Sequence, residues 1–183
     1  MAFSDGEKLI IAMMADLHRH LGVEDSVELD FVQKAISYGD TWALKSKYPG
    51  IFSDTKERNP ADVQFVHDAL TMWSILERSY EELSDEDKEK VRNAPGSHGH
   101  APRFEGFDGH SDLVSIARTM IEDLEYYEEF EGRALDAHMP INEVHERLVA
   151  AFKPLREQLH FGLLSADAII SVIDNRIHPE NRA

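Results

Sequence analysis

Apolar residues along this chain recur at intervals of three and four, which is the period of an amphipathic helix. The segment 61–83 shows this most clearly, because it carries two neighbouring apolar stripes. These are Val63, Val66, Leu70 and Trp73 in one stripe, and Phe65, Ala69, Met72 and Leu76 in the other. So wide an apolar arc predicts burial against neighbours on two sides. With Asn59–Pro60 as a start signal, we expect a long central helix near residues 60–82.

Capping and stop signals divide the front of the chain into shorter helices. The first is expected over residues 5–21, where Ser4 and Glu7 form a capping box. Two more are expected over 28–38 and 40–48, because a glycine or proline follows each of them.

A further amphipathic pattern runs from Leu113 to Tyr127, with apolar residues on one face and acidic residues on the other. We therefore expect a helix through this segment. The acidic tract 122–132 is expected to be mostly its solvated face. Asp108 or Ser111 is placed to cap the start of this helix.

Serine and proline mark the remaining helices. Ser84 is placed to cap a short charged helix over 85–92, and Ser165 to cap a last helix that continues to Ile177. Pro154 lies inside the pattern that follows Pro140, where a proline removes a backbone hydrogen bond, so a kink or an end is expected there.

The pattern contains no credible strand pair and no internal repeat. A chain of 183 residues most simply forms one domain and can bury a sizeable core. We therefore predict an all-α fold, with residues 1–183 in a single compact domain of about seven helices. Residues 94–110 are expected to form a long irregular loop.

Composition narrows the classes of function. The net charge of −16 repels phosphate backbones and anionic lipid heads, so neither nucleic acid nor membrane is expected as a direct partner. The absence of cysteine excludes disulfides, thiolate zinc sites and cysteine nucleophiles. The longest apolar run, 9–15, is too short to cross a membrane, and acidic residues precede it. These features favour a cytoplasmic location.

Histidines offer the only metal candidates. His98, His100 and His110 lie in the irregular loop, but glycine-flanked histidines do not by themselves fix the geometry that a zinc site needs. The pair His67–Asp68, with an upstream histidine such as His18, resembles the dyad of helical metal-dependent phosphohydrolases, although short motifs match easily by chance. No cofactor is therefore expected.

Three segments carry a resemblance to a known family. They are "RFEGFDGHSD" ahead of an amphipathic helix, "FEGRALDAH", and "LLSADAIISVIDNRI" near the end. Together with the front segment "SDGEKLIIAMMADL", they make the chain resemble the YfbU family of bacterial and archaeal proteins, over roughly Ser4 to Ile177. The resemblance implies an all-helical, cytoplasmic, oligomeric protein and suggests a regulatory role, and it implies no catalytic residues.

The segment 103–111 is the most specific part of that resemblance. Phe104 and Phe107 are spaced to insert apolar side chains into the body, and Gly106 and Gly109 permit backbone shapes closed to other residues. A purely structural role explains this pattern: the segment 103–111, which we call the clamp, fastens itself to the body through its two phenylalanines. Alternatively, a glycine-rich segment ahead of a helix binds an anion or nucleotide, with Arg103 and the loop around Asp108 completing the site.

The leading interpretation is a non-enzymatic interaction or regulatory module that self-associates and has a further, unidentified protein partner. Apolar side chains such as Met13, Met14 and Trp42 supply surface for such contacts. Two alternatives stay open: a metal-dependent hydrolase of helical fold, and an anion- or nucleotide-binding protein that uses the 103–111 loop.

Overall fold

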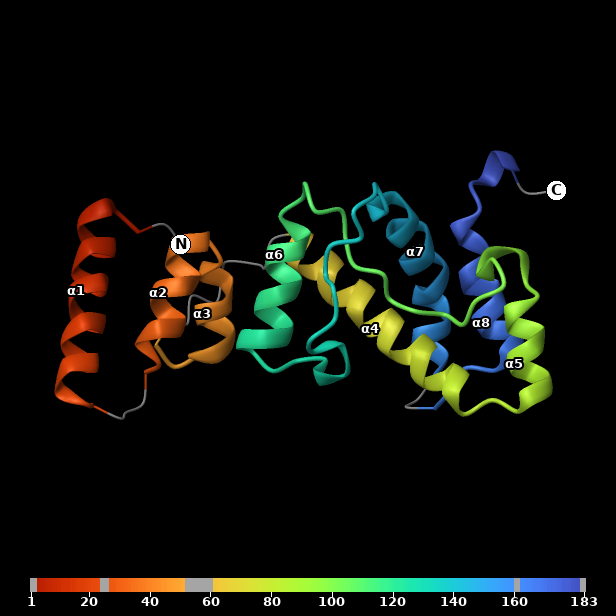
Figure 1. The fold of residues 1–183 in the computed structure, drawn as a ribbon, viewed down its shortest axis with the longest axis horizontal. Coiled ribbons are helices and arrows are strands. Elements are labelled where there is room, and N and C mark those ends of the chain that lie inside the picture. The colour runs from red at the N-terminus through yellow and green to blue at the C-terminus, as the bar shows by residue number, and fades with distance from the viewer. Residues whose placement is uncertain (1–2, 24–26, 52–60, 160–161, 182–183) are drawn as a thin grey trace.

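A computed structural model of the protein describes residues 3–23, 27–51, 61–159 and 162–181. Over these residues the chain is all-α, as predicted, and it contains eight α-helices and no strand (Figure 1). The helices are α1 (Asp5–Leu21), α2 (Leu29–Tyr38), α3 (Thr41–Lys47), α4 (Ala61–Glu81), α5 (Asp85–Arg92), α6 (Leu113–Arg118), α7 (Asn142–Gln158) and α8 (Ala166–Ile173).

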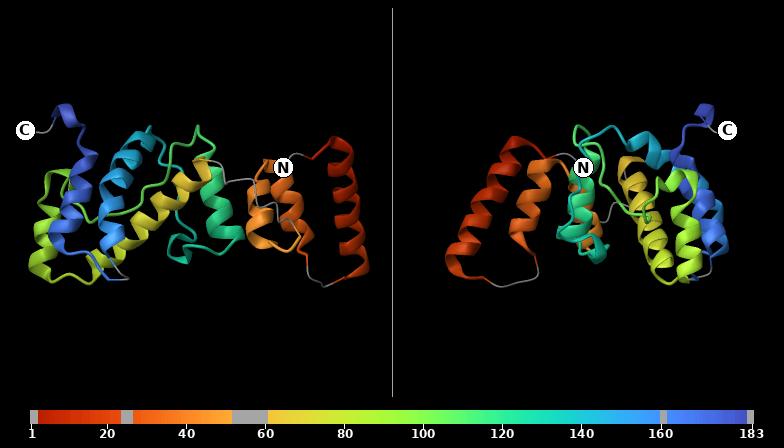
Figure 2. Two further views of the ribbon diagram at one scale, coloured as in Figure 1. Left: turned by 180° about the vertical axis from the view of Figure 1, so that it is seen from behind. Right: turned by 45° about the vertical axis from the view of Figure 1, so that its right-hand side comes forward.

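The helices bury two hydrophobic clusters. The larger one surrounds α4 and takes side chains from α5 to α8 and from the loops between them. The smaller one lies between α2 and α3, with Ile11 of α1 packed against it. Trp42 contacts both clusters. Figures 1 and 2 show α1 at the outer end of the molecule, beside α2 and away from α4.

The buried carboxylate of Asp40 joins the two clusters. It accepts hydrogen bonds of 3.2 Å from Nε1 of Trp42 in α3 and from the hydroxyls of Ser115 and Thr119. Lys34 of α2 adds a 2.7 Å ion pair to Asp123. Polar contacts from α2, α3 and the α6 region therefore hold the front helices against the body.

The central helix was predicted correctly. Val66, Ala69, Leu70, Met72, Trp73 and Leu76 of α4 are all completely buried. Only the half-buried Phe65 lies at the edge of the predicted arc. The expected start signal, Asn59–Pro60, lies outside the described residues.

Most predicted helix ends are confirmed. Ser4 and Glu7 form the expected capping box, and Gly22 ends α1 in the left-handed conformation. Gly39 ends α2 in the same way. Ser84 and Ser165 accept the predicted capping hydrogen bonds from Asp87 N and Ala168 N.

The helix expected over 113–127 is shorter than predicted. It changes to a wider π-helical turn over Thr119–Asp123, after which Glu125 and Tyr127 have positive φ angles. The acidic tract is therefore a turn and not a solvated helix face. Burial explains the break, because Phe130 is completely buried and the hydroxyl of Tyr127 lies 2.7 Å from Thr71 Oγ1.

The last two helices also depart from the sequence pattern. A kink or an end was expected at Pro154; α7 continues through this proline to Gln158, so the helix does not end there. α8 ends at Ile173, and a 3₁₀ turn over Asp174–Arg176 replaces the expected continuation to Ile177. In that turn, the side chain of Asp174 accepts a 2.9 Å hydrogen bond from Gly96 N, which ties the irregular loop to the end of the chain.

Candidate functional site

The segment 103–109 enters the core through its two phenylalanines. Phe104 is 3% exposed and Phe107 is fully buried, and their ring centroids lie 5.3 Å apart in an edge-to-face arrangement. The ring of Phe130 lies 5.3 Å from that of Phe104. The predicted insertion of apolar side chains into the body is therefore present.

Gly106 and Gly109 allow this segment to approach a second one closely. Phe107 N donates a 2.8 Å hydrogen bond to Leu135 O, and Ala137 N donates one of 2.8 Å to Phe107 O. Gly106 has a φ of 93°, and a Cβ there would lie 2.6 Å from Leu135 O. The second segment belongs to "FEGRALDAH", so the structure brings two of the family-like motifs together.

A buried histidine links the clamp to the two longest helices of the body. His145 of α7 is 0% exposed, its Nε2 lies 2.8 Å from Gly106 O, and its Nδ1 lies 3.2 Å from Nε1 of Trp73. Burial lowers the pKa of His145 to about 4. The sequence analysis missed this residue, although its spacing to Leu148 and Phe152 places it on the buried face of α7.

The expected helix cap is wrong. Asp108 Oδ1 accepts a 3.0 Å hydrogen bond from His110 N, and the Ser111 hydroxyl donates one of 2.6 Å to Asp108 O. Both side chains therefore close their own turn, and α6 begins after Asp112 without a side-chain cap.

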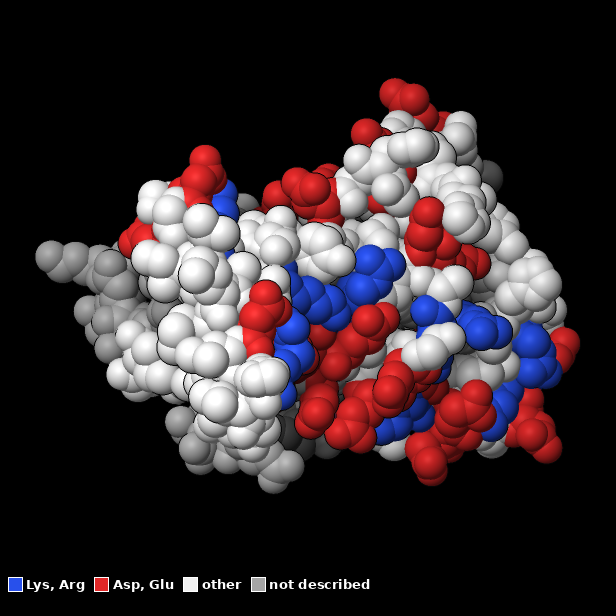
Figure 3. Space-filling model, turned by 60° about the vertical axis from the view of Figure 1, so that its left-hand side comes forward, with Lys and Arg blue, Asp and Glu red and all other residues white. Residues whose placement is uncertain are grey.

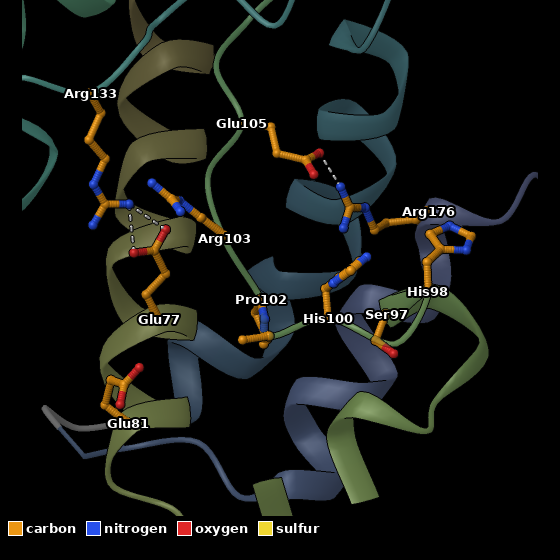
Figure 4. A pocket seen from close by; sticks show the side chains of 11 residues that line it. Glu77, Glu81, Ser97, His98, His100, Pro102, Arg103, Glu105, Arg133 and Arg176 are labelled. Atoms are coloured by element: carbon orange, nitrogen blue, oxygen red, sulfur yellow. Dashed lines mark hydrogen bonds and ion pairs between the residues drawn. The ribbon is translucent and has the colours of Figure 1, made fainter. Parts of the chain in front are cut away.

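A pocket of about 700 Å³ lies around Arg103, at the beginning of the clamp segment, and is also lined by residues from the segment 97–102 (Figure 4). Nη1 of Arg133 donates to both carboxylate oxygens of Glu77, at 2.8 and 3.0 Å. Glu77 also accepts a 2.7 Å hydrogen bond from Phe104 N. Arg176 pairs with Glu105. Two ion pairs, Arg133–Glu77 and Arg176–Glu105, therefore form part of the wall of this pocket.

The candidate histidines separate into two places. His98 and His100 line the pocket around Arg103, whereas His110 lines a different hollow with Asp108, Gly109 and Asp136. Arg103 is therefore not brought to the same hollow as the glycine-rich turn. Within the described ranges, no three His, Asp or Glu side chains are close enough together to hold a metal ion.

The His67–Asp68 pair lies in α4, far from His18 in α1 (Figure 1). Asp68 is used in a 3.1 Å ion pair with Arg156. The His67 ring packs edge-to-face on Tyr127, and burial lowers the pKa of His67. The upstream histidine that a phosphohydrolase dyad needs is therefore not beside it.

The outer face of α1 is an exposed apolar surface. It consists of Leu9, Ile10, Met13, Leu17 and Leu21, which are 48–63% exposed. We call it the α1 face. The opposite side of α1, with Ala15 and Ile11, packs on the front cluster. Figure 3 shows a broad uncharged area at this end of the molecule, next to a dense group of charged side chains in the same view.

Over the described residues, these features are those of an all-α protein with an exposed apolar helix face and a pocket lined by charged side chains. No helix in the described part of the chain has the length and hydrophobicity needed to span a membrane. The chain belongs to the YfbU family, because the model of the YfbU domain matches residues 1–175. No curated protein and no solved structure matches the chain.

Proposed function

We propose that this protein is a non-enzymatic, self-associating helical module whose copies join through the α1 face. The observation that carries this proposal is the exposure of Ile10 and Met13, which are 60% and 63% exposed on a helix whose other side is packed. Burying one such side chain contributes about 1.5–3 kcal/mol. A contiguous apolar surface of this kind is typical of an interface.

The proposed occupant of the α1 face is a second copy of the same helix in antiparallel orientation. The first turn of α1 carries Asp5 and Glu7, whereas its last turn carries His18, Arg19 and His20. In an antiparallel pair, each acidic turn lies beside the last turn of the other copy, where Arg19 already pairs with Asp16 and Asp30 and the histidines offer hydrogen-bond donors. A twofold interface is self-complementary in this way, and α1 is about 25 Å long, enough for several turns of contact.

Net charge supports the same choice of surface. Two copies with a charge of −16 repel each other over most of their surfaces. The α1 face offers apolar side chains with few charges among them, so contact there buries hydrophobic surface with the least repulsion. Added salt screens the remaining repulsion, and self-association is therefore expected to strengthen as ionic strength rises.

The test is the molar mass in solution, measured by light scattering and sedimentation, for the protein and two variants. The double variant Ile10→Glu/Met13→Glu places two charges in the α1 face and is expected to be monomeric with unchanged helix content. The control Ala150→Glu adds one charge at an exposed position of α7 and is expected to keep the parent mass. A monomeric parent protein at tens of micromolar, or an oligomeric double variant, would overturn the proposal.

A further inference from the structure

The methionines among the described residues differ sharply in exposure. Met72 and Met120 are buried in the main hydrophobic cluster, whereas Met13, Met14 and Met139 are 63%, 46% and 55% exposed. The chain contains no cysteine, so no thiolate competes with these thioethers for an oxidant. In the described part of the chain, an oxidant in solution therefore reaches the sulfur atoms of α1 and of Met139.

Met13 lies at the middle of α1, as the ninth of its 17 residues. In a full-length antiparallel pair of α1 helices, a twofold axis therefore passes beside Met13, and the two Met13 side chains meet there. Leu9 and Leu17 lie one turn to either side on the same face. Because the proposed pairing places Met13 at the centre of the interface, a change in this side chain acts twice.

The surroundings of Met13 on α1 offer no hydrogen-bond donor for an added oxygen. Residues 9–17 are all apolar except Asp16, whose carboxylate only accepts hydrogen bonds. The internal backbone N–H groups of an α-helix are used in its own hydrogen bonds. An oxygen added to the Met13 sulfur is therefore hydrated in the free protomer and has no donor in the paired state.

We propose that oxidation of Met13 to its sulfoxide by hydrogen peroxide separates the paired copies. This inference rests on the proposed self-association through the α1 face. The sulfur lone pair attacks one peroxide oxygen, and the S–O bond forms as the O–O bond breaks. The hydroxide that leaves takes the proton from the transferred oxygen and becomes water. Sulfur loses two electrons and the peroxide gains them, so the reaction needs no other reactant.

The expected effect is large because the twofold interface contains two sulfoxides. Each one loses its hydration on pairing and finds no donor in exchange. We expect the dissociation constant to rise by about tenfold for each sulfoxide, and so by about a hundredfold in all. The free protomer is the form that reacts, because pairing covers Met13.

The test measures molar mass by light scattering before and after mild peroxide treatment, and peptide mass spectrometry follows the conversion of each methionine. We expect an oligomer before treatment and protomers once Met13 is converted, with unchanged helix content. A protein that is monomeric before treatment contradicts the proposed self-association itself. An oligomer that persists after complete conversion of Met13 contradicts this inference alone.

Two variants assign the effect to its residue. Met13→Leu/Met14→Leu keeps the α1 face apolar and is expected to stay oligomeric in peroxide. Met139→Leu removes a similarly exposed methionine outside α1 and is expected to dissociate as the parent protein does. Dissociation of the α1 variant, or a Met139→Leu protein that no longer responds, would assign the effect to other residues and overturn the proposal.

Protection by pairing gives an independent measurement. The rate of Met13 oxidation is expected to fall as protein concentration rises above the dissociation constant, because fewer protomers are free. The rate at Met139 is expected to stay constant over the same range. A Met13 rate that is equally independent of concentration would mean that the interface does not cover this side chain, and the proposal would fail.

Discussion

Nε1 of Trp73 donates a hydrogen bond of 3.2 Å to Nδ1 of His145 in the centre of the protein. Because Nδ1 accepts, the proton of the neutral ring is on Nε2, which donates to Gly106 O at 2.8 Å. A single imidazole therefore satisfies a buried donor on α4 and a buried acceptor on the clamp loop.

Replacing this imidazole is expected to destabilise the fold. His145→Leu keeps a side chain of similar size but leaves Trp73 Nε1 and Gly106 O buried without partners. The expected loss is about 2–4 kcal/mol in the free energy of unfolding. Urea denaturation measures it, with His110→Leu as a control at an exposed loop position, where about 0.5 kcal/mol or less is expected. Equal values for the two variants would show that the buried network contributes nothing specific.

The same histidine predicts how stability depends on pH. Burial lowers the pKa of His145 to about 4, whereas a histidine in an unfolded chain has a pKa of about 6.5. Between these values the unfolded state binds more protons, so stability is complete above about pH 6.5 and falls as the pH decreases toward 4.

The expected decrease in unfolding free energy from this group is about 1 kcal/mol between pH 7 and pH 5.5. Urea denaturation at the two values measures it in the parent protein and in His145→Leu. The variant lacks the titrating group, so its decrease is expected to be smaller by that amount. An identical pH dependence in both proteins would exclude His145 as the source.

The sequence predicted elements that depend on local signals. The capping box at Ser4 and the wide apolar arc around Trp73 each need only neighbours along the chain, and both were found. The helix expected over 113–127 failed because a distant contact decides it. Tyr127 turns inward to bond with Thr71, and no periodicity within the segment contains that information.

In the candidate site, too, the sequence predicts what local signals decide and misses what distant contacts decide. Phe104 and Phe107 could be predicted as core residues from their spacing and type. The role of His145 could not, because it depends on Trp73 and Gly106, which lie 72 and 39 residues away. The Arg103 pocket likewise gathers Glu77, Arg133 and Arg176 from three separate segments. Only the folded chain shows that their charges pair.

The close approach at Gly106 gives the last prediction. Gly106→Ala introduces a Cβ that would lie 2.6 Å from Leu135 O, at a φ of 93° that L side chains rarely adopt. Gly99→Ala is the matched control, because Gly99 has a φ of 83° but nothing within 4 Å of the new Cβ. Backbone strain alone costs about 1–2 kcal/mol in each variant.

The backbone contact with Leu135 adds to this cost only at Gly106. Gly106→Ala is therefore expected to lose at least about 1–2 kcal/mol more than Gly99→Ala in urea denaturation. Since the clamp also holds Phe107 against residues 135–137, hydrogen exchange at Phe107 N and Ala137 N is expected to quicken in this variant alone. Equal destabilisation in the two variants would mean that the clamp tolerates separation from residues 135–137.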